Sequence, residues 1–172
     1  MDRVKILNNN KVLKIVSILI LGSLLLTISA KIKIPFYPVP MTMQTFVVIF
    51  LGLAFGSKLA TATVGLYLIE GLIGLPVFSN SPEKGVGLVY FTGPTMGYLI
   101  GFLFTAYFAG YLNFKTNFLI IFSKLVFVVS FIYIFGLIWL GILIGWDKPI
   151  LELGAYPVSY THIRAHETST YL

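Results

Sequence analysis

Residues 117–145 read NFLIIFSKLVFVVSFIYIFGLIWLGILIG, the longest apolar run in the chain, with Lys124 as its one charged residue. A helix needs about 20 mainly apolar residues to cross the hydrocarbon core of a bilayer. This run exceeds that length, and a lysine two turns from its start can extend its ammonium group to the interface. The stretch therefore predicts a membrane-spanning helix and indicates that the chain is an integral membrane protein.

Four further apolar runs have the boundaries of membrane-spanning helices. They cover residues 12–30, 41–56, 59–75 and 94–112. The second run begins after Pro40, because prolines break a helix, and the third ends near Gly74 and Pro76. Five spans leave only connections and tails in a chain of 172 residues. We predict an all-α integral membrane protein, a transmembrane helical bundle of five spans in one domain that covers residues 1–157.

Composition excludes several other classes of protein. The chain is 58% hydrophobic and 10% charged and contains no cysteine, whereas soluble domains are about 45–50% apolar and about 25% charged. A water-soluble globule, a disordered chain and a disulfide scaffold are therefore excluded. Both histidines, His162 and His166, lie near the C-terminus, and the apolar body holds no phosphate-binding loop. We expect no enzymatic activity, cofactor, metal or nucleic-acid partner.

The basic residues predict the orientation in the membrane, because cytoplasmic connections carry an excess of lysine and arginine. With the N-terminus inside, the inner side receives Arg3, Lys5, Lys11, Lys14, Lys58, Lys115 and Lys124, and the outer side receives Lys31, Lys33, Lys84 and Lys148. We therefore expect a multi-pass protein of the cell membrane with a cytoplasmic N-terminus. Both long connections, residues 31–40 and 74–93, then face outward.

The outward-facing connections combine aromatic and uncharged polar side chains. They read KIKIPFYPVPMTMQTF (residues 31–46) and GLPVFSNSPEKGVGLVYFTGPTMGYLIG (residues 74–101). Such linings suit a small ligand with an apolar body and a few amide-like groups; an interfacial aromatic belt is the alternative interpretation. Two helix N-termini also point outward, where a carboxylate could be held. Lys31, Lys33 and Lys84 either add charge there or are solvated loop residues.

Small residues recur every four positions in the fourth span, at Gly93, Gly97 and Gly101. Such a stripe lets another helix approach closely. We expect it to pack within the bundle, with docking of a separate partner as the alternative. Thr92 and Pro94 have the chemistry of an N-cap and a first helical residue, so we place the start of this helix there.

Glu70 is the one acidic residue well inside a predicted span. An intramembrane carboxylate is a candidate proton or cation site, which would suit a proton-coupled secondary transporter. Because Glu70 lies near the outer end of its helix, it could instead reach interfacial water or a loop lysine. Both interpretations stay open from the sequence.

Three motifs resemble one known family. They are IPFYPVPMTMQTF (residues 34–46), GLPVF (74–78) and GPTMGYLIGF (93–102). Their order and spacing are similar to those of BioY, the biotin-specific S component of energy-coupling-factor (ECF) transporters, over about residues 10–157. The resemblance implies a six-helix bundle that captures biotin from outside. It also implies two kinds of partner, a transmembrane coupling protein and a pair of ATPase subunits.

The resemblance further implies roles for individual residues. The contacts to the ligand fall on Asn80 and Tyr90, with Gln44, Thr42, Thr95 and Tyr98 as further contacts. The contact with the coupling protein falls on small residues of the first helix, here Gly22, Ser23, Thr27 and Ala30. The ligand contacts agree with the chemistry of biotin, whose ureido ring needs hydrogen-bond donors and acceptors.

The C-terminus departs from the family pattern. The family continues with Pro-Gly-Asp and a lysine that open a sixth helix, whereas Pro157 is followed here by VSYTHIRAHETSTYL (residues 158–172). This segment is short and polar and resembles the translation of a sequencing adaptor, so we interpret it as non-native. A chain without the sixth helix should bind biotin weakly or not at all.

Three other functions stay open beside biotin capture. An S component for another vitamin would have a similar fold and lining, and a proton-coupled secondary transporter would use Glu70. A structural membrane protein would not need the patterned connections. Membrane lipid is a partner in every case.

Overall fold

The structure, a computed structural model, describes residues 2–34, 39, 41–83, 85–112 and 117–151. Its elements are α1 (Asp2–Lys31), β1 (Lys33–Ile34), β2 (Met41–Thr42), α2 (Gln44–Leu72), α3 (Leu88–Phe91), α4 (Met96–Ala109) and α5 (Phe118–Ile144). The predicted helical membrane class is confirmed, and a two-residue β-ladder is added to it. The predicted non-native tail, residues 158–172, lies outside the described residues.

Helix limits follow the predicted spans most closely in α5, which ends one residue inside each predicted limit. Gly145 follows it with φ +90°, a left-handed conformation that glycine adopts readily at a helix end. Helix α1 begins at Asp2, well before the predicted span. A helix does not have to end where its apolar side chains end, and only Lys11–Lys31 is apolar enough to cross a membrane.

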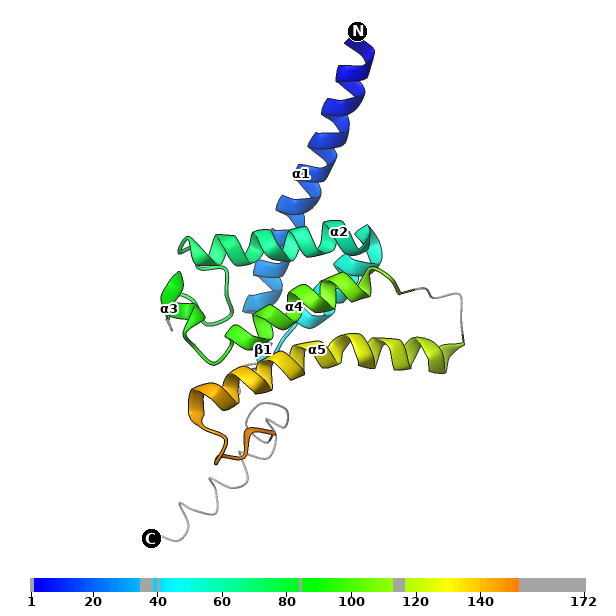
Figure 1. Cartoon of the computed structure of the whole chain (residues 1–172). Helices are drawn as coiled ribbons and strands as arrows, with labels where there is room; N and C mark the ends of the chain where they lie inside the picture. The colour runs from blue at the N-terminus through cyan, green and yellow to red at the C-terminus, as the bar shows by residue number, and fades with distance from the viewer. Residues whose placement is uncertain (1, 35–38, 40, 84, 113–116, 152–172) are drawn as a thin grey trace, which may run out of the picture.

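The predicted second and third spans form the two halves of α2, which meet at Gly56. This glycine has φ +78° and ψ 170°, a backbone conformation that residues with a β-carbon rarely adopt. The chain turns back there in Figure 1, so the first and last residues of α2 lie toward the same end of the bundle. That end also carries α3.

Helix α4 lies between α2 and α5, and α1 packs against α2 (Figure 1). Glycine makes the contact of α4 with α5 close: a β-carbon at Gly101 would lie 2.6 Å from Cα of Ile132. Trp139 of α5 adds a hydrogen bond from Nε1 to the carbonyl oxygen of Gly93, at 2.9 Å. The small-residue stripe of the fourth span therefore packs within the bundle, as expected.

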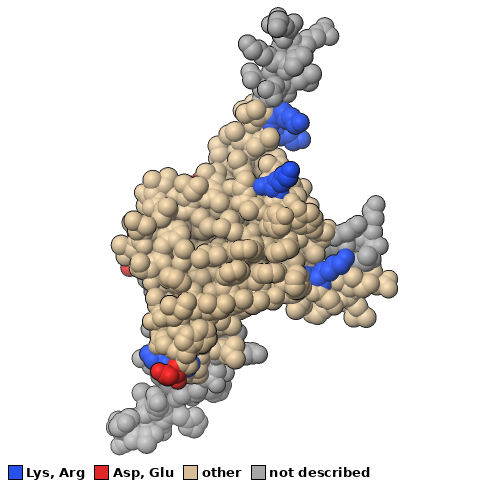
Figure 2. Space-filling view, in the orientation of Figure 1, with Lys and Arg blue, Asp and Glu red and all other residues tan. Residues whose placement is uncertain are grey.

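Large apolar side chains cover the outside of the helices. Phe118 and Leu119 of α5 are 78% and 75% exposed, and Figure 2 shows a face that is almost entirely uncharged, with charged side chains at its edges. Within the described ranges, α1, α2 and α5 are long and apolar enough to cross a membrane, and α4 is a shorter apolar helix. Apolar surface of this extent is what a helix presents to lipid.

The start of α4 differs from the prediction. The helix begins at Met96, with Thr95 in the N-cap position. Thr92 instead follows α3, and its hydroxyl donates to the carbonyl oxygen of Val89 at 2.8 Å. A threonine hydroxyl can bond to a carbonyl three residues earlier. The prediction of Thr92 as the N-cap of α4 is wrong, because Thr92 ends α3 and lies three residues before the actual N-cap.

Candidate ligand-binding site

Polar and aromatic side chains gather at the end of the bundle that carries α3. The β-ladder pairs Lys33 with Thr42 and Ile34 with Met41, which brings the end of α1 next to the start of α2. The segment 77–81 and α3 complete this end. We call the following set the polar cluster: Lys33, Thr42, Gln44, Tyr67, Ser79, Asn80 and Tyr90.

One part of the polar cluster is a chain of hydrogen bonds between the two halves of α2. The Thr42 hydroxyl donates to Gln44 Oε1 at 3.2 Å, and Gln44 Nε2 donates to the Tyr67 hydroxyl at 2.7 Å. Tyr67 donates in turn to the carbonyl oxygen of Val77 at 3.2 Å. Gln44 is 3% exposed and Tyr67 is fully buried. These bonds satisfy polar groups whose burial without partners would be costly.

Phe78 connects the two parts of the polar cluster. Its ring stacks on Tyr90 with centroids 4.6 Å apart, and it meets Tyr67 edge-on at 5.3 Å. The Tyr90 hydroxyl lies 3.3 Å from Ser79 Oγ, within hydrogen-bonding distance. Buried aromatic rings therefore lie beside hydroxyl and amide groups. This combination suits a ligand with apolar rings and a few hydrogen-bonding groups.

Two lysines hold the turn formed by residues 78–81. Lys31 Nζ donates to the carbonyl oxygens of Phe78 at 2.8 Å and Ser81 at 2.7 Å. Lys33 Nζ donates to the carbonyl oxygen of Ser79 at 2.7 Å and to Asn80 Oδ1 at 3.1 Å. Both ammonium groups are therefore bonded to the loop. From the sequence, either lysine could have been a solvated loop residue without such bonds.

The structure brings four of the six predicted ligand contacts into the polar cluster: Thr42, Gln44, Asn80 and Tyr90. The other two lie on α4. Thr95 stands at its N-terminal end, where the helix dipole is positive. Tyr98 is 8% exposed, and its ring packs edge-on against Tyr133 of α5 with centroids 6.5 Å apart. A ligand contact by any of the six stays a prediction.

The residues predicted to contact a coupling protein are Gly22, Ser23, Thr27 and Ala30. Gly22, Ser23 and Ala30 are buried, and a β-carbon at Gly22 would meet Thr63 of α2 at 2.5 Å. Thr27 is half-buried and donates to the carbonyl oxygen of Ser23 at 3.0 Å. This side of α1 therefore packs inside the bundle. Its contact with another protein stays a prediction.

Glu70 has a partner that the sequence did not reveal. The Ser23 hydroxyl donates to Glu70 Oε2, and the bond joins α1 to the second half of α2. Glu70 is half-buried. The carboxyl group thus has a structural role between two helices, whether or not it also exchanges a proton.

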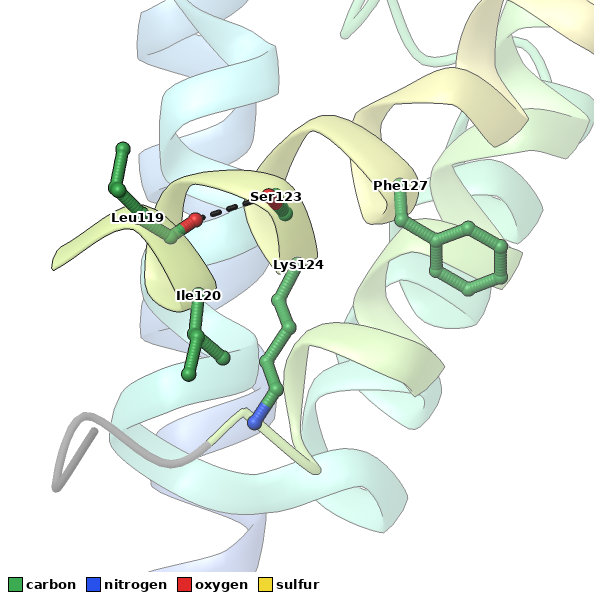
Figure 3. Close-up of a pocket in the computed structure, with 5 residues that line it drawn as sticks. All are labelled: Leu119, Ile120, Ser123, Lys124 and Phe127. Carbon is green, nitrogen blue, oxygen red and sulfur yellow. Dashed lines mark hydrogen bonds between the residues drawn. The ribbon is translucent and has the colours of Figure 1, made fainter. Parts of the chain in front are cut away.

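A separate hollow lies on the first turns of α5, toward the end of the bundle opposite α3 (Figures 1 and 3). It is lined by Leu119, Ile120, Ser123, Lys124 and Phe127. The Ser123 hydroxyl donates to its own helix, to the carbonyl oxygen of Leu119 at 2.9 Å. All five residues belong to one helix, and an apolar surface with one lysine is typical of a helix end in lipid. The polar cluster therefore remains the candidate site.

Three members of the polar cluster were not predicted from sequence as site residues: Lys33, Tyr67 and Ser79. Tyr67 lies in an apolar run, and no local pattern separates it from a tyrosine that only packs. Its spacing from Val64 and Gly71, both buried on the same helix face, could have indicated that it points inward. Lys33 was interpreted as either a source of charge or a solvated loop residue, because its partners Ser79 and Asn80 lie far away in sequence.

The polar cluster offers neutral donors and acceptors, aromatic rings and one lysine. In the described part of the chain, no group of three or more His, Asp or Glu residues could hold a metal ion. The fold is that of a membrane-embedded helical bundle, and the polar cluster is a candidate ligand site at one end of it. A sequence model of the BioY family matches residues 4–163. The chain belongs to the BioY family, as the three motifs predicted.

Similar proteins cover most of the chain. The "Probable biotin transporter BioY" of Pyrococcus horikoshii is 35% identical over 144 residues, which are 84% of this chain and 84% of that protein. The "Biotin transporter BioY" of Thermotoga maritima is 35% identical over 134 residues, 77% of this chain and 78% of that protein. A crystal structure of the S-component for biotin from an ECF-type ABC transporter has a TM-score of 0.65 at 26% identity, and covers 91% of this chain and 94% of that one.

The match to the BioY family extends to residue 163, whereas we predicted from the sequence that the native chain ends at residue 157. That boundary stays a prediction.

Proposed function

We propose that this protein captures biotin at the outer face of the cell membrane, as the substrate-binding S component of an ECF-type transporter. The proposal rests on the polar cluster, found in a chain of the BioY family whose similar proteins are named biotin transporters. The similarity to the solved S-component for biotin supports the same ligand.

The chemistry of the polar cluster suits the parts of biotin. The amides of Gln44 and Asn80 and the hydroxyls of Thr42 and Tyr90 supply donors and acceptors for the ureido ring. The stacked, buried rings of Tyr90 and Phe78 give this end of the bundle an apolar character that suits the fused ring system. The N-terminal end of α4, beside Thr95 and one turn before Tyr98, is a place where a carboxylate would be stabilised by the helix dipole.

The proposed partners are a transmembrane coupling protein and a pair of ATPase subunits from other chains. The sequence contains no phosphate-binding loop with its lysine, so ATP hydrolysis would have to occur elsewhere. The coupling protein would contact α1 through Gly22, Ser23, Thr27 and Ala30. Because most of this surface packs against α2, the contact would require α1 to shift relative to α2.

Competition binding tests the choice of vitamin. Purified protein is incubated with labelled biotin and an excess of unlabelled biotin, thiamine or riboflavin. We expect displacement by biotin alone. Displacement by thiamine or riboflavin with no preference for biotin would indicate an S component for another vitamin.

Uptake assays test the energy source. Cells that express the chain with and without ECF coupling protein and ATPases are compared for accumulation of labelled biotin. We expect accumulation to depend on these partners. Accumulation without them that follows the proton gradient would favour a secondary transporter and contradict the proposed partners.

A further inference from the structure

Lys33 contacts the side chain of Asn80, a proposed ligand contact. Its Nζ lies 3.1 Å from Asn80 Oδ1 and 2.7 Å from the carbonyl oxygen of Ser79. An ammonium group has three donors and no acceptor, whereas the asparagine amide carries an acceptor on one side and two donors on the other. Lys33 can therefore bond only to the oxygen side of the amide, and this contact fixes the orientation of the Asn80 side chain.

The orientation of Asn80 decides what the site offers to a ligand. With Oδ1 bonded to Lys33, Nδ2 is directed to the other side of the amide group. In the parts of the chain that the structure describes, no residue accepts a hydrogen bond from this Nδ2. The group of Asn80 that faces away from Lys33 is therefore a donor, which matches a ligand carbonyl and does not match another donor.

Lys33 is itself held in place. Its backbone pairs with Thr42 in the β-ladder, and Thr42 is bonded to Gln44 of the same cluster. Lys31 holds the same turn but contacts only the backbone, at Phe78 and Ser81. The two lysines thus differ in one respect: only Lys33 bonds to the Asn80 side chain.

We propose that Lys33 is a positioning residue, which orients the Asn80 amide so that the site donates a hydrogen bond to the ureido carbonyl of the ligand. The inference rests on the proposed function, biotin capture. It makes Lys33 a determinant of specificity for a ligand with an acceptor at that position.

Biotin and 2-iminobiotin test this role, because 2-iminobiotin carries an N–H group in place of the ureido oxygen. Dissociation constants of both ligands are measured for the unchanged chain and for Lys33→Met, Lys33→Arg and Lys31→Met. In Lys33→Met the Asn80 amide can rotate, and the preference for biotin over 2-iminobiotin should fall about tenfold, the worth of one hydrogen bond. Lys33→Arg keeps a donor and should keep the preference.

Lys31→Met is the matched control, because it removes the same charge from the same turn without touching the Asn80 side chain. It should leave the preference unchanged even if both ligands bind more weakly. An unchanged preference in Lys33→Met, or an equal fall in Lys31→Met, would overturn the inference while the unchanged chain still binds biotin. If the unchanged chain binds biotin too weakly to measure, the same variants are made in a fusion in which residues 1–157 continue into the C-terminal segment of the Thermotoga maritima relative. Absence of biotin binding by both proteins would overturn the proposed function and this inference together.

Discussion

Gln44 and Tyr67 lie on opposite halves of α2 and share a buried hydrogen bond at the candidate site. Gln44 could be predicted from sequence as a site residue, since it belongs to a recognisable motif next to the prolines. Tyr67 could not, because its partner is 23 residues away and only the turn at Gly56 brings the two together. At the scale of single residues, sequence therefore identifies polar groups in loops better than the buried partners that hold them.

The bond between Gln44 and Tyr67 predicts a non-additive loss of stability. Gln44→Leu and Tyr67→Phe should each lower the free energy of unfolding by about 1–3 kcal/mol, because each removes a hydrogen bond from a buried polar partner. The double variant should lose less than the sum of the two. Denaturant unfolding of the four proteins in detergent measures this, and strictly additive losses would show that the two groups act independently.

The bond between Ser23 and Glu70 predicts how a neutral side chain behaves at position 70. Glu70→Gln keeps an oxygen that can accept the Ser23 hydrogen bond, so biotin uptake and its dependence on pH should stay unchanged. Glu70→Leu removes the acceptor and should lower thermal stability. Uptake across a range of pH values is the measurement, and a flattened pH profile in Glu70→Gln would support proton coupling instead.

At the scale of helices, apolar runs predict where spans lie, because a helix that crosses the bilayer needs apolar side chains along its whole length. They do not predict the β-ladder, since strands of two residues are too short to have an alternating pattern. They also misplace the start of α4, where the choice between Thr92 and Thr95 depends on α3, an element of four residues. Short elements that depend on local hydrogen bonds are the part that sequence does not resolve.

The close contact of α4 with α5 predicts that alanine destabilises the protein at Gly101 and not at Gly65. Gly101→Ala places a β-carbon about 2.6 Å from Cα of Ile132, so the helices must separate, with an expected loss of about 1–3 kcal/mol. Gly65→Ala is the matched control, because a β-carbon there meets no atom within 4 Å. Thermal unfolding of both variants is the measurement. Equal stability of the two would contradict the packing of α4 on α5.

At the scale of the whole molecule, composition alone predicts a membrane protein and the charge distribution predicts its orientation. Because the chain contains no cysteine, single cysteines can report this orientation without background. Glu83→Cys should react with a membrane-impermeant maleimide in intact cells, since it lies in an outward-facing connection. Lys58→Cys, next to the turn at Gly56, should react only after the membrane is permeabilised. The reverse pattern would place the polar cluster in the cytoplasm and contradict capture from outside.

The central claim is that the site selects biotin. Calorimetric titration tests it on two proteins: the 172-residue chain, and a fusion in which residues 1–157 continue into the C-terminal segment of the Thermotoga maritima relative. The fusion supplies a family C-terminus in place of residues 158–172. We predict saturable biotin binding by the fusion, weaker or absent binding by the unmodified chain, and no heat from thiamine or riboflavin with either. Failure of both proteins to bind biotin, or equal binding of another vitamin, would contradict the account.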